Sequence, residues 1–187
     1  LAPMEDVSDP PFRAVCKDNG VDLMYTEFIS SEGLIRDAVK STHKLDIFEY
    51  ERPVGIQIFG HRIESMREAT LMAEQVNPDL IDINFGCPVN NVACRGAGAG
   101  MLKDIPMMLK MTAEIVKTTR LPVTVKTRLG WDDNSINIVE VAEQLQDVGI
   151  KALSIHARTR EQKYKGNADW TWLGKIKDNP RFKIPLF

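Results

Sequence analysis

Short apolar segments alternate with longer amphipathic segments along the whole chain. Runs rich in aliphatic and β-branched residues predict strands at residues 1–4, 23–28, 54–59, 80–84, 123–127, 152–156 and 184–187. Between them, apolar side chains recur near a 3.6-residue period at residues 63–76, 107–118 and 138–148, which predicts surface helices. Asn134-Ser135 offers an N-cap for the last of these helices, and Gly149 offers its end.

This alternation of strands and helices predicts βα units and a parallel sheet in one domain. A doubly wound sheet and a (β/α)8 barrel both fit the order of elements. The barrel is favoured because the expected first βα turn lacks a Gly-x-Gly-x-x-Gly motif, and because polar or reactive groups recur at many strand ends. These groups are Met4, Glu27, Gln57, Asn84, Lys126, Arg128 and His156.

Chain length limits how much of a barrel can be present. A complete (β/α)8 TIM barrel usually needs about 250 residues, whereas this chain has 187. We therefore expect an incomplete α/β barrel, holding about the first six to seven βα units, over residues 1–187 of a longer protein.

Composition narrows the class of protein. A hydrophobic fraction of 43% is enough for a sizeable core, and the net charge of −2 means that a nucleic acid could bind only at a local basic patch. The odd number of cysteines, Cys16, Cys87 and Cys94, favours reduced thiols and a cytoplasmic location. No apolar run is long enough to cross a membrane, and no signal-peptide pattern is visible.

The segment Ile-Asp-Ile-Asn-Phe-Gly-Cys-Pro at residues 81–88 carries the strongest chemical signal. An apolar strand there ends in a turn with an amide, Asn84, and a thiol, Cys87. Side chains at the C-terminal ends of barrel strands face the active site, so both residues are candidates for catalysis. The glycine-rich residues 96–100 predict either a phosphate cradle or a tight, closely packed turn.

Six ordered motifs resemble the tRNA-dihydrouridine synthases, most closely the bacterial branch once labelled nitrogen-regulation proteins. They keep that family's order and spacing over the whole chain. The motifs are Leu1-Ala2-Pro3-Met4 with Val7-Ser8-Asp9-Pro10-Pro11-Phe12-Arg13, Gln57-Ile58-Phe59-Gly60, Asp82-Ile83-Asn84-Phe85-Gly86-Cys87-Pro88, Gly96-Ala97-Gly98-Ala99-Gly100, Val125-Lys126-Thr127-Arg128-Leu129-Gly130 and His156-Ala157-Arg158-Thr159.

The resemblance implies an FMN-dependent oxidoreductase that reduces a specific uridine of tRNA to 5,6-dihydrouridine with NADPH as electron donor. Flavin N5 would deliver hydride to C6 of the uracil, and Cys87 would donate a proton to C5. An ordinary thiol, with a pKa of about 8.5, is mostly protonated at neutral pH and can act as this acid. Asn84 would align the base or the loop.

The same resemblance assigns binding residues. The cofactor would contact Pro3, Met4, Gln57, Lys126 and His156. The tRNA would contact Arg128 and a basic stretch on the rim of the site, made of Arg158, Arg160, Lys163, Tyr164 and Lys165. No metal site is implied, and the protein is expected to be a monomer. A separate C-terminal helical domain carries much of the family's tRNA binding, and nothing in this chain corresponds to it.

The chain departs from the family pattern at two places. Glu5-Asp6 replaces a common Ala-Gly pair, and Val89-Asn90-Asn91 stands where many members carry basic residues.

Two alternative functions remain open. A related FMN barrel acting on a free pyrimidine, such as a dihydroorotate or dihydropyrimidine dehydrogenase, would need no basic rim. A non-catalytic RNA-binding barrel would bind no flavin.

Overall fold

A computed structural model describes residues 1–187 and contains one six-stranded parallel sheet. Its strands are β1 (Met24–Tyr25), β2 (Ile29–Ser30), β3 (Val54–Phe59), β4 (Leu80–Asn84), β5 (Val123–Arg128) and β6 (Ala152–His156). The order in the sheet is β1-β3-β4-β5-β6, with β2 also paired to β3. From β3 onward each strand lies beside the next one along the chain. A doubly wound sheet reverses this order at a switch point, so the fold is the incomplete (β/α)8 barrel that the sequence predicts.

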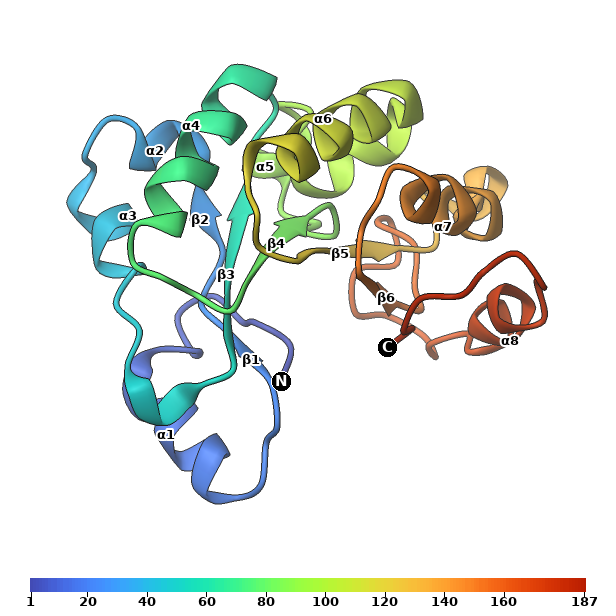
Figure 1. The fold of residues 1–187 in the computed structure, drawn as a ribbon. Helices are drawn as coiled ribbons and strands as arrows, with labels where there is room; N and C mark the ends of the chain where they lie inside the picture. The colour runs from blue at the N-terminus through green and yellow to red at the C-terminus, as the bar shows by residue number, and fades with distance from the viewer.

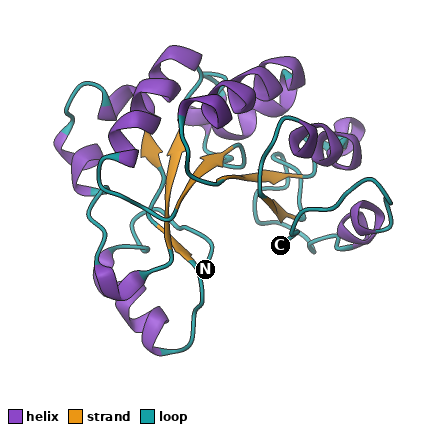
Figure 2. Cartoon of the chain, viewed as in Figure 1, coloured by secondary structure: helices purple, strands orange, loops and turns teal.

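Helices cover the outer side of the curled sheet. They are α1 (Pro10–Asp18), α2 (Ser31–Leu34), α3 (Val39–His43), α4 (Ile63–Glu74), α5 (Asn90–Ala93), α6 (Ile105–Thr118), α7 (Ile138–Asp147) and α8 (Thr171–Lys177), with 3-10 turns η1 (Glu49–Glu51), η2 (Gly98–Lys103) and η3 (Asp133–Ser135). Figure 1 shows the strands fanned in an arc, with α4, α6 and α7 along its convex side and both termini on the concave side. The helices and strands alternate along the arc (Figure 2). No helix is long and apolar enough to span a membrane.

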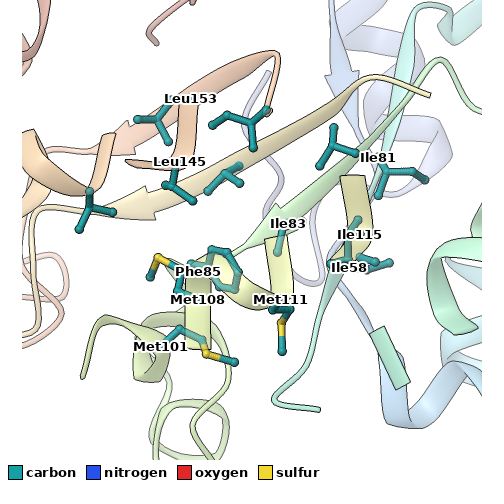
Figure 3. Close-up of a cluster of buried hydrophobic side chains, with 14 of the residues drawn as sticks. Ile58, Ile81, Ile83, Phe85, Met101, Met108, Met111, Ile115, Leu145 and Leu153 are labelled. Atoms are coloured by element: carbon teal, nitrogen blue, oxygen red, sulfur yellow. The ribbon is translucent and has the colours of Figure 1, made fainter. Parts of the chain in front are cut away.

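The hydrophobic core lies between the sheet and these outer helices. Alternate residues of each strand point outward, so Ile81 and Ile83 of β4 pack with Met108, Met111 and Ile115 of α6 (Figure 3). The intervening strand residues face the concave side of the sheet and are mostly polar. The core therefore fixes which side chains each strand presents to the concave side.

Two of the predicted strands differ in the structure. Residues 1–4 form no strand, because Met4 closes a turn: its N–H donates to Ser8 Oγ at 2.8 Å and its carbonyl accepts from Ser8 N at 3.0 Å. Of the predicted strand 23–28 only Met24–Tyr25 (β1) is a strand, and β2 (Ile29–Ser30) begins after the predicted end. The pairing with β3 is interrupted where the Thr26 hydroxyl, and not a backbone carbonyl, accepts from Gln57 N at 3.3 Å.

The predictions near the C-terminal end are partly confirmed. Residues 184–187 run parallel to β6 and form an isolated bridge between Leu153 and Leu186, with a further backbone hydrogen bond from Ile155 N to Phe187 O at 2.8 Å. Asn134-Ser135 lies in η3 and does not cap α7, which begins after Asn137 with no side-chain cap. Gly149, with φ of +108°, follows the end of α7 as predicted.

The packing of α6 on the sheet predicts that two substitutions by alanine lower the stability by very different amounts. Met108→Ala removes a fully buried side chain and should lower the free energy of unfolding by about 2–5 kcal/mol. Leu71→Ala, at a side chain that is 49% exposed on α4, should cost less than about 1 kcal/mol. Urea unfolding followed by circular dichroism measures both values. Equal losses would contradict this assignment of the core.

Candidate active site

A cleft of about 470 Å³ opens at the C-terminal ends of the strands. The N-terminal turn forms one wall, and the ends of β3, β4, β5 and β6 form its floor. Parallel strands bring their C-terminal ends to one edge, which is why residues far apart in sequence meet there. The predicted site residues that line the cleft are Pro3, Met4, Gln57, Asn84, Cys87, Lys126, Arg128, His156 and Tyr164.

A chain of side-chain hydrogen bonds crosses the floor of the cleft. Asp82 Oδ2 accepts from Gln57 Nε2 at 2.6 Å, and Gln57 Oε1 accepts from Asn84 Nδ2 at 2.9 Å. The Thr124 hydroxyl donates to the other oxygen of Asp82. Burial raises the pKa of Asp82 to about 6, against the lowering effects of the hydrogen bonds from Thr124 and Gln57 and of the Lys126 charge. Sequence reasoning missed Asp82, although it lies on the same strand face as Asn84.

Asn84 holds the loop that carries the thiol. Its Oδ1 accepts from the backbone N–H groups of Gly86 and Cys87, both at 2.9 Å, which is the turn that asparagine side chains commonly stabilise. The glycine-rich segment closes over the other side of this loop. Gly98 has φ of +54°, and a Cβ there would lie 3.0 Å from Cys87 Cβ. Ala99 N also donates to Cys87 O at 3.0 Å, so the segment packs closely against the thiol loop.

The Cys87 thiol is held in its protonated form. The residue is only 6% exposed, and this burial raises the pKa of the thiol above its usual value. The Val89 N–H and the Arg128 guanidinium act in the opposite direction but do not overcome burial. The raised pKa favours the thiol over the thiolate at neutral pH.

Lys126 presents the cleft with a cation that has no partner in the protein. It lies opposite Asn84 in the sheet, and its ammonium group makes no hydrogen bond or ion pair. Burial is the main cause that lowers the pKa of Lys126, while the Asp82 charge raises it and the Arg128 charge lowers it further. A partly buried, unpaired ammonium in a cleft is suited to an anionic or electron-rich ligand.

Arg128 supports two loops. It is 2% exposed, and its Nε donates to Gly86 O at 2.7 Å. Its Nη1 donates to Thr159 O at 3.2 Å and to Lys163 O at 2.9 Å. Most of the guanidinium donors are thus used inside the protein, and only Nη2 remains for the predicted contact with substrate.

His156 is neutral and its tautomer is set by a neighbour. Arg158 Nη1 lies 2.9 Å from His156 Nε2, and because arginine can only donate, Nε2 accepts and the ring proton is on Nδ1. Burial lowers the pKa of His156 to about 4, with further lowering by the charges of Arg128, Lys126 and Arg158. The ring can therefore offer the cleft an N–H donor.

The basic rim follows β6 and divides into two parts. Tyr164 is 75% exposed and borders the cleft, with its ring centroid 5.8 Å from that of His156. Lys163 and Tyr164 also border a neighbouring hollow of about 350 Å³, whose other wall is residues 88–91. This places the aromatic ring between the thiol loop and open solvent.

The remaining rim cations lie farther from the thiol. Arg160 donates to Asn90 Oδ1 at 2.5 Å, and its guanidinium carbon lies 4.4 Å from the centre of the Trp131 ring. Arg158 donates to Gly166 O at 2.8 Å, and Lys165 is exposed to solvent. The structure therefore brings the predicted rim together on one loop but leaves these three side chains outside the cleft.

The Glu5-Asp6 departure changes the border of the cleft. Asp6 adopts φ of +58°, a left-handed conformation that glycine favours and aspartate tolerates. Its N–H donates to the Glu27 carboxylate. Glu5 lines the cleft and pairs with Lys44 at 2.5 Å. The turn thus keeps the shape of a glycine turn while adding a carboxylate to the wall.

The surroundings of His156 predict that its ring does not titrate near neutral pH. Because its pKa is about 4 instead of 6.5, less than a tenth of the ring should be protonated at pH 6. An NMR titration of the ring protons from pH 8 to pH 4.5 should show a shift only at the acid end. A midpoint near 6.5 for His156 would contradict the assigned environment.

Comparison with known proteins identifies the family of the chain. A family model described as "Dihydrouridine synthase (Dus)" matches residues 1–187. The chain is 39% identical over 177 residues to a probable tRNA-dihydrouridine synthase 1 of Synechocystis, covering 94% of this chain and 50% of that protein. It is 36% identical to a probable tRNA-dihydrouridine synthase of Rickettsia prowazekii, covering 100% of this chain and 57% of the relative.

A further curated relative and one solved structure also align with the chain. The chain is 36% identical to tRNA-dihydrouridine synthase B of Xanthomonas axonopodis, covering 95% of this chain and 53% of that protein. A solved nitroalkane oxidase from Streptomyces ansochromogenes aligns with a TM-score of 0.49 at 14% identity, covering 100% of this chain and 56% of the other. The chain spans about half the length of the curated relatives it matches. With a family model matched over all its residues and these relatives at 36–39% identity, the chain belongs to the dihydrouridine synthase family.

Proposed function

We propose that residues 1–187 form most of the flavin-binding barrel of a tRNA-dihydrouridine synthase that reduces one uridine of tRNA to 5,6-dihydrouridine, with NADPH as electron donor. One observation carries the proposal: a protonated thiol, Cys87, and an unpaired ammonium, Lys126, line the same cleft. Reduction of a uracil ring by hydride and proton needs an acid on the protein and a site for an electron-rich cofactor.

The residues of the cleft fit FMN. The Lys126 ammonium has no partner in the protein and would hold the electron-rich part of the flavin ring. Gln57 keeps one N–H of its Nε2 and one lone pair of its Oε1 beyond the bonds it makes to Asp82 and Asn84. The backbone groups of Met4 are used within its own turn, so that residue would contribute mainly its side chain.

FMN, when bound in its reduced form, supplies the hydride that adds to C6 of the uracil. Cys87 would donate its proton to C5, where negative charge develops. The raised pKa keeps the thiol protonated until the substrate arrives, and Asn84 holds the loop so that the sulfur stays in place. His156 would offer Nδ1–H as a neutral donor to the cofactor or the base.

The rim would bind the RNA. A uridine must leave the stacked tRNA structure to reach the cleft, and the exposed Tyr164 ring would stack against a displaced base. Arg158, Arg160, Lys163 and Lys165 would contact phosphates, which gives a local basic surface on a chain whose net charge is −2. This arrangement favours tRNA over a free pyrimidine as the substrate.

The proposal is tested on the complete gene product that contains these residues. It is purified, its flavin absorbance is recorded, and it is incubated with NADPH and unmodified tRNA before nucleoside analysis. Bound flavin together with dihydrouridine supports the proposal. Bound flavin with reduction of free pyrimidine instead of tRNA would favour the dehydrogenase-like alternative, and RNA binding without flavin would favour a non-catalytic barrel.

The assigned acid gives a separate prediction. Cys87→Ala should lower the rate of dihydrouridine formation by about 10²–10⁴-fold, the usual contribution of a positioned general acid, while FMN stays bound. Cys87→Ser should also be slow because a hydroxyl is far less acidic. Cys94→Ser, at an exposed thiol outside the cleft, is the matched control and should keep the wild-type rate. An unchanged rate in Cys87→Ala would rule out the thiol as proton donor.

A further inference from the structure

We propose that Asp82 is a positioning residue: it sets the direction of the hydrogen bonds that run through Gln57 and Asn84 to the backbone of Cys87, and so holds the thiol in place. Its importance for catalysis rests on the proposed function. The hydrogen-bond chain itself can be tested without any assay of activity.

The direction of the chain follows from the chemistry of its two ends. An ionised carboxylate only accepts hydrogen bonds, so Gln57 must turn Nε2 toward Asp82 and Oε1 toward Asn84. Asn84 then turns Nδ2 toward Gln57 and Oδ1 toward the N–H groups of Gly86 and Cys87. Reversing the amides would bring two oxygens together at Asp82 and two sets of N–H groups together at the loop.

Burial prevents the amide groups from adopting the reverse orientation. Asp82, Gln57 and Asn84 are all buried, so an amide turned the wrong way would find no water to pair with. The sheet register also holds the three side chains in line. Gln57 lies opposite Asp82 across β3 and β4, and Asp82 lies opposite Thr124 across β4 and β5. The Thr124 hydroxyl occupies the second oxygen of Asp82, which leaves the first for Gln57.

Two variants separate the hydrogen-bond acceptor from the side-chain volume. Asp82→Leu keeps the branched shape and the number of side-chain heavy atoms but offers no acceptor, so Gln57 Nε2 loses its partner. Asp82→Asn keeps an acceptor toward Gln57 and can donate to the Thr124 hydroxyl, which completes the chain without a charge. The proposal therefore expects damage in Asp82→Leu and rescue in Asp82→Asn.

The readout is the reactivity of the Cys87 thiol. In the complete gene product carrying Cys16→Ser and Cys94→Ser, Cys87 is the only cysteine of residues 1–187, and its alkylation by iodoacetamide is followed by mass spectrometry of its peptide. In the parent protein, burial of Cys87 slows this reaction. In Asp82→Leu the loop loses its support, so the rate should rise by about tenfold as exposure and thiolate fraction increase. Asp82→Asn should stay within about threefold of the parent.

A control distinguishes positioning from general loss of stability. Thr112→Val removes a buried hydroxyl that donates to Met108 O at 2.8 Å on α6, away from the chain of hydrogen bonds. Its alkylation rate should match the parent. If Asp82→Leu does not fold, Gln57→Met breaks the chain one step along and should give the same rise. A folded Asp82→Leu or Gln57→Met with the parent rate would overturn the proposal, and so would an equal rise in Thr112→Val.

Turnover adds a second measurement that depends on the proposed function. With tRNA and NADPH, Asp82→Leu should lose kcat while the KM for tRNA stays near the parent value, because the rim is unchanged. If the parent forms no dihydrouridine, the proposed function fails, yet the alkylation rates still decide the role of Asp82. The two failures are therefore distinguishable.

Discussion

The structure depends on the two-residue period of its parallel strands. One set of side chains, such as Ile81 and Ile83, packs against the outer helices. The other set faces the concave side and is polar, yet it is also largely removed from water. Buried polar groups must find partners within the protein, and the strand register decides which groups are close enough to pair. Packing on the convex side thus determines the chemistry of the concave side.

The cleft combines polar groups that are satisfied with one that is not. Asp82, Gln57 and Asn84 pair with one another and with backbone, so they behave as fixed scaffolding. Lys126 lies in the same layer without any partner. An unpaired, partly buried ammonium costs free energy, and that cost is offset when a ligand supplies the missing interaction. This contrast supports the proposal that the cleft binds a ligand.

The sequence predicted the strands correctly where the hydrophobic pattern alone determines them. Residues 54–59, 80–84 and 152–156 are strands with the predicted limits, because each is a short apolar run between helices. The prediction was wrong at residues 1–4 and only partly right at residues 23–28, where the hydroxyls of Ser8 and Thr26 redirect backbone hydrogen bonds in ways that the pattern does not show. The candidate residues for the cofactor and the thiol lie at one cleft, as the strand-end argument expected. The partners of Asp82 and the burial of Arg128 depend on register and loop packing, which no local pattern encodes.

Arg128 gives the site a property that neither of its loops has alone. One guanidinium bonds Gly86 beside the thiol and also Thr159 and Lys163 on the rim. Immobilising the rim therefore removes freedom from the thiol loop, since both share the same anchor. In thermodynamic terms, part of the entropy that the thiol loop loses on ordering is lost already when the outer loop is held. The reverse also applies: a well-ordered thiol loop leaves the rim less to lose on binding.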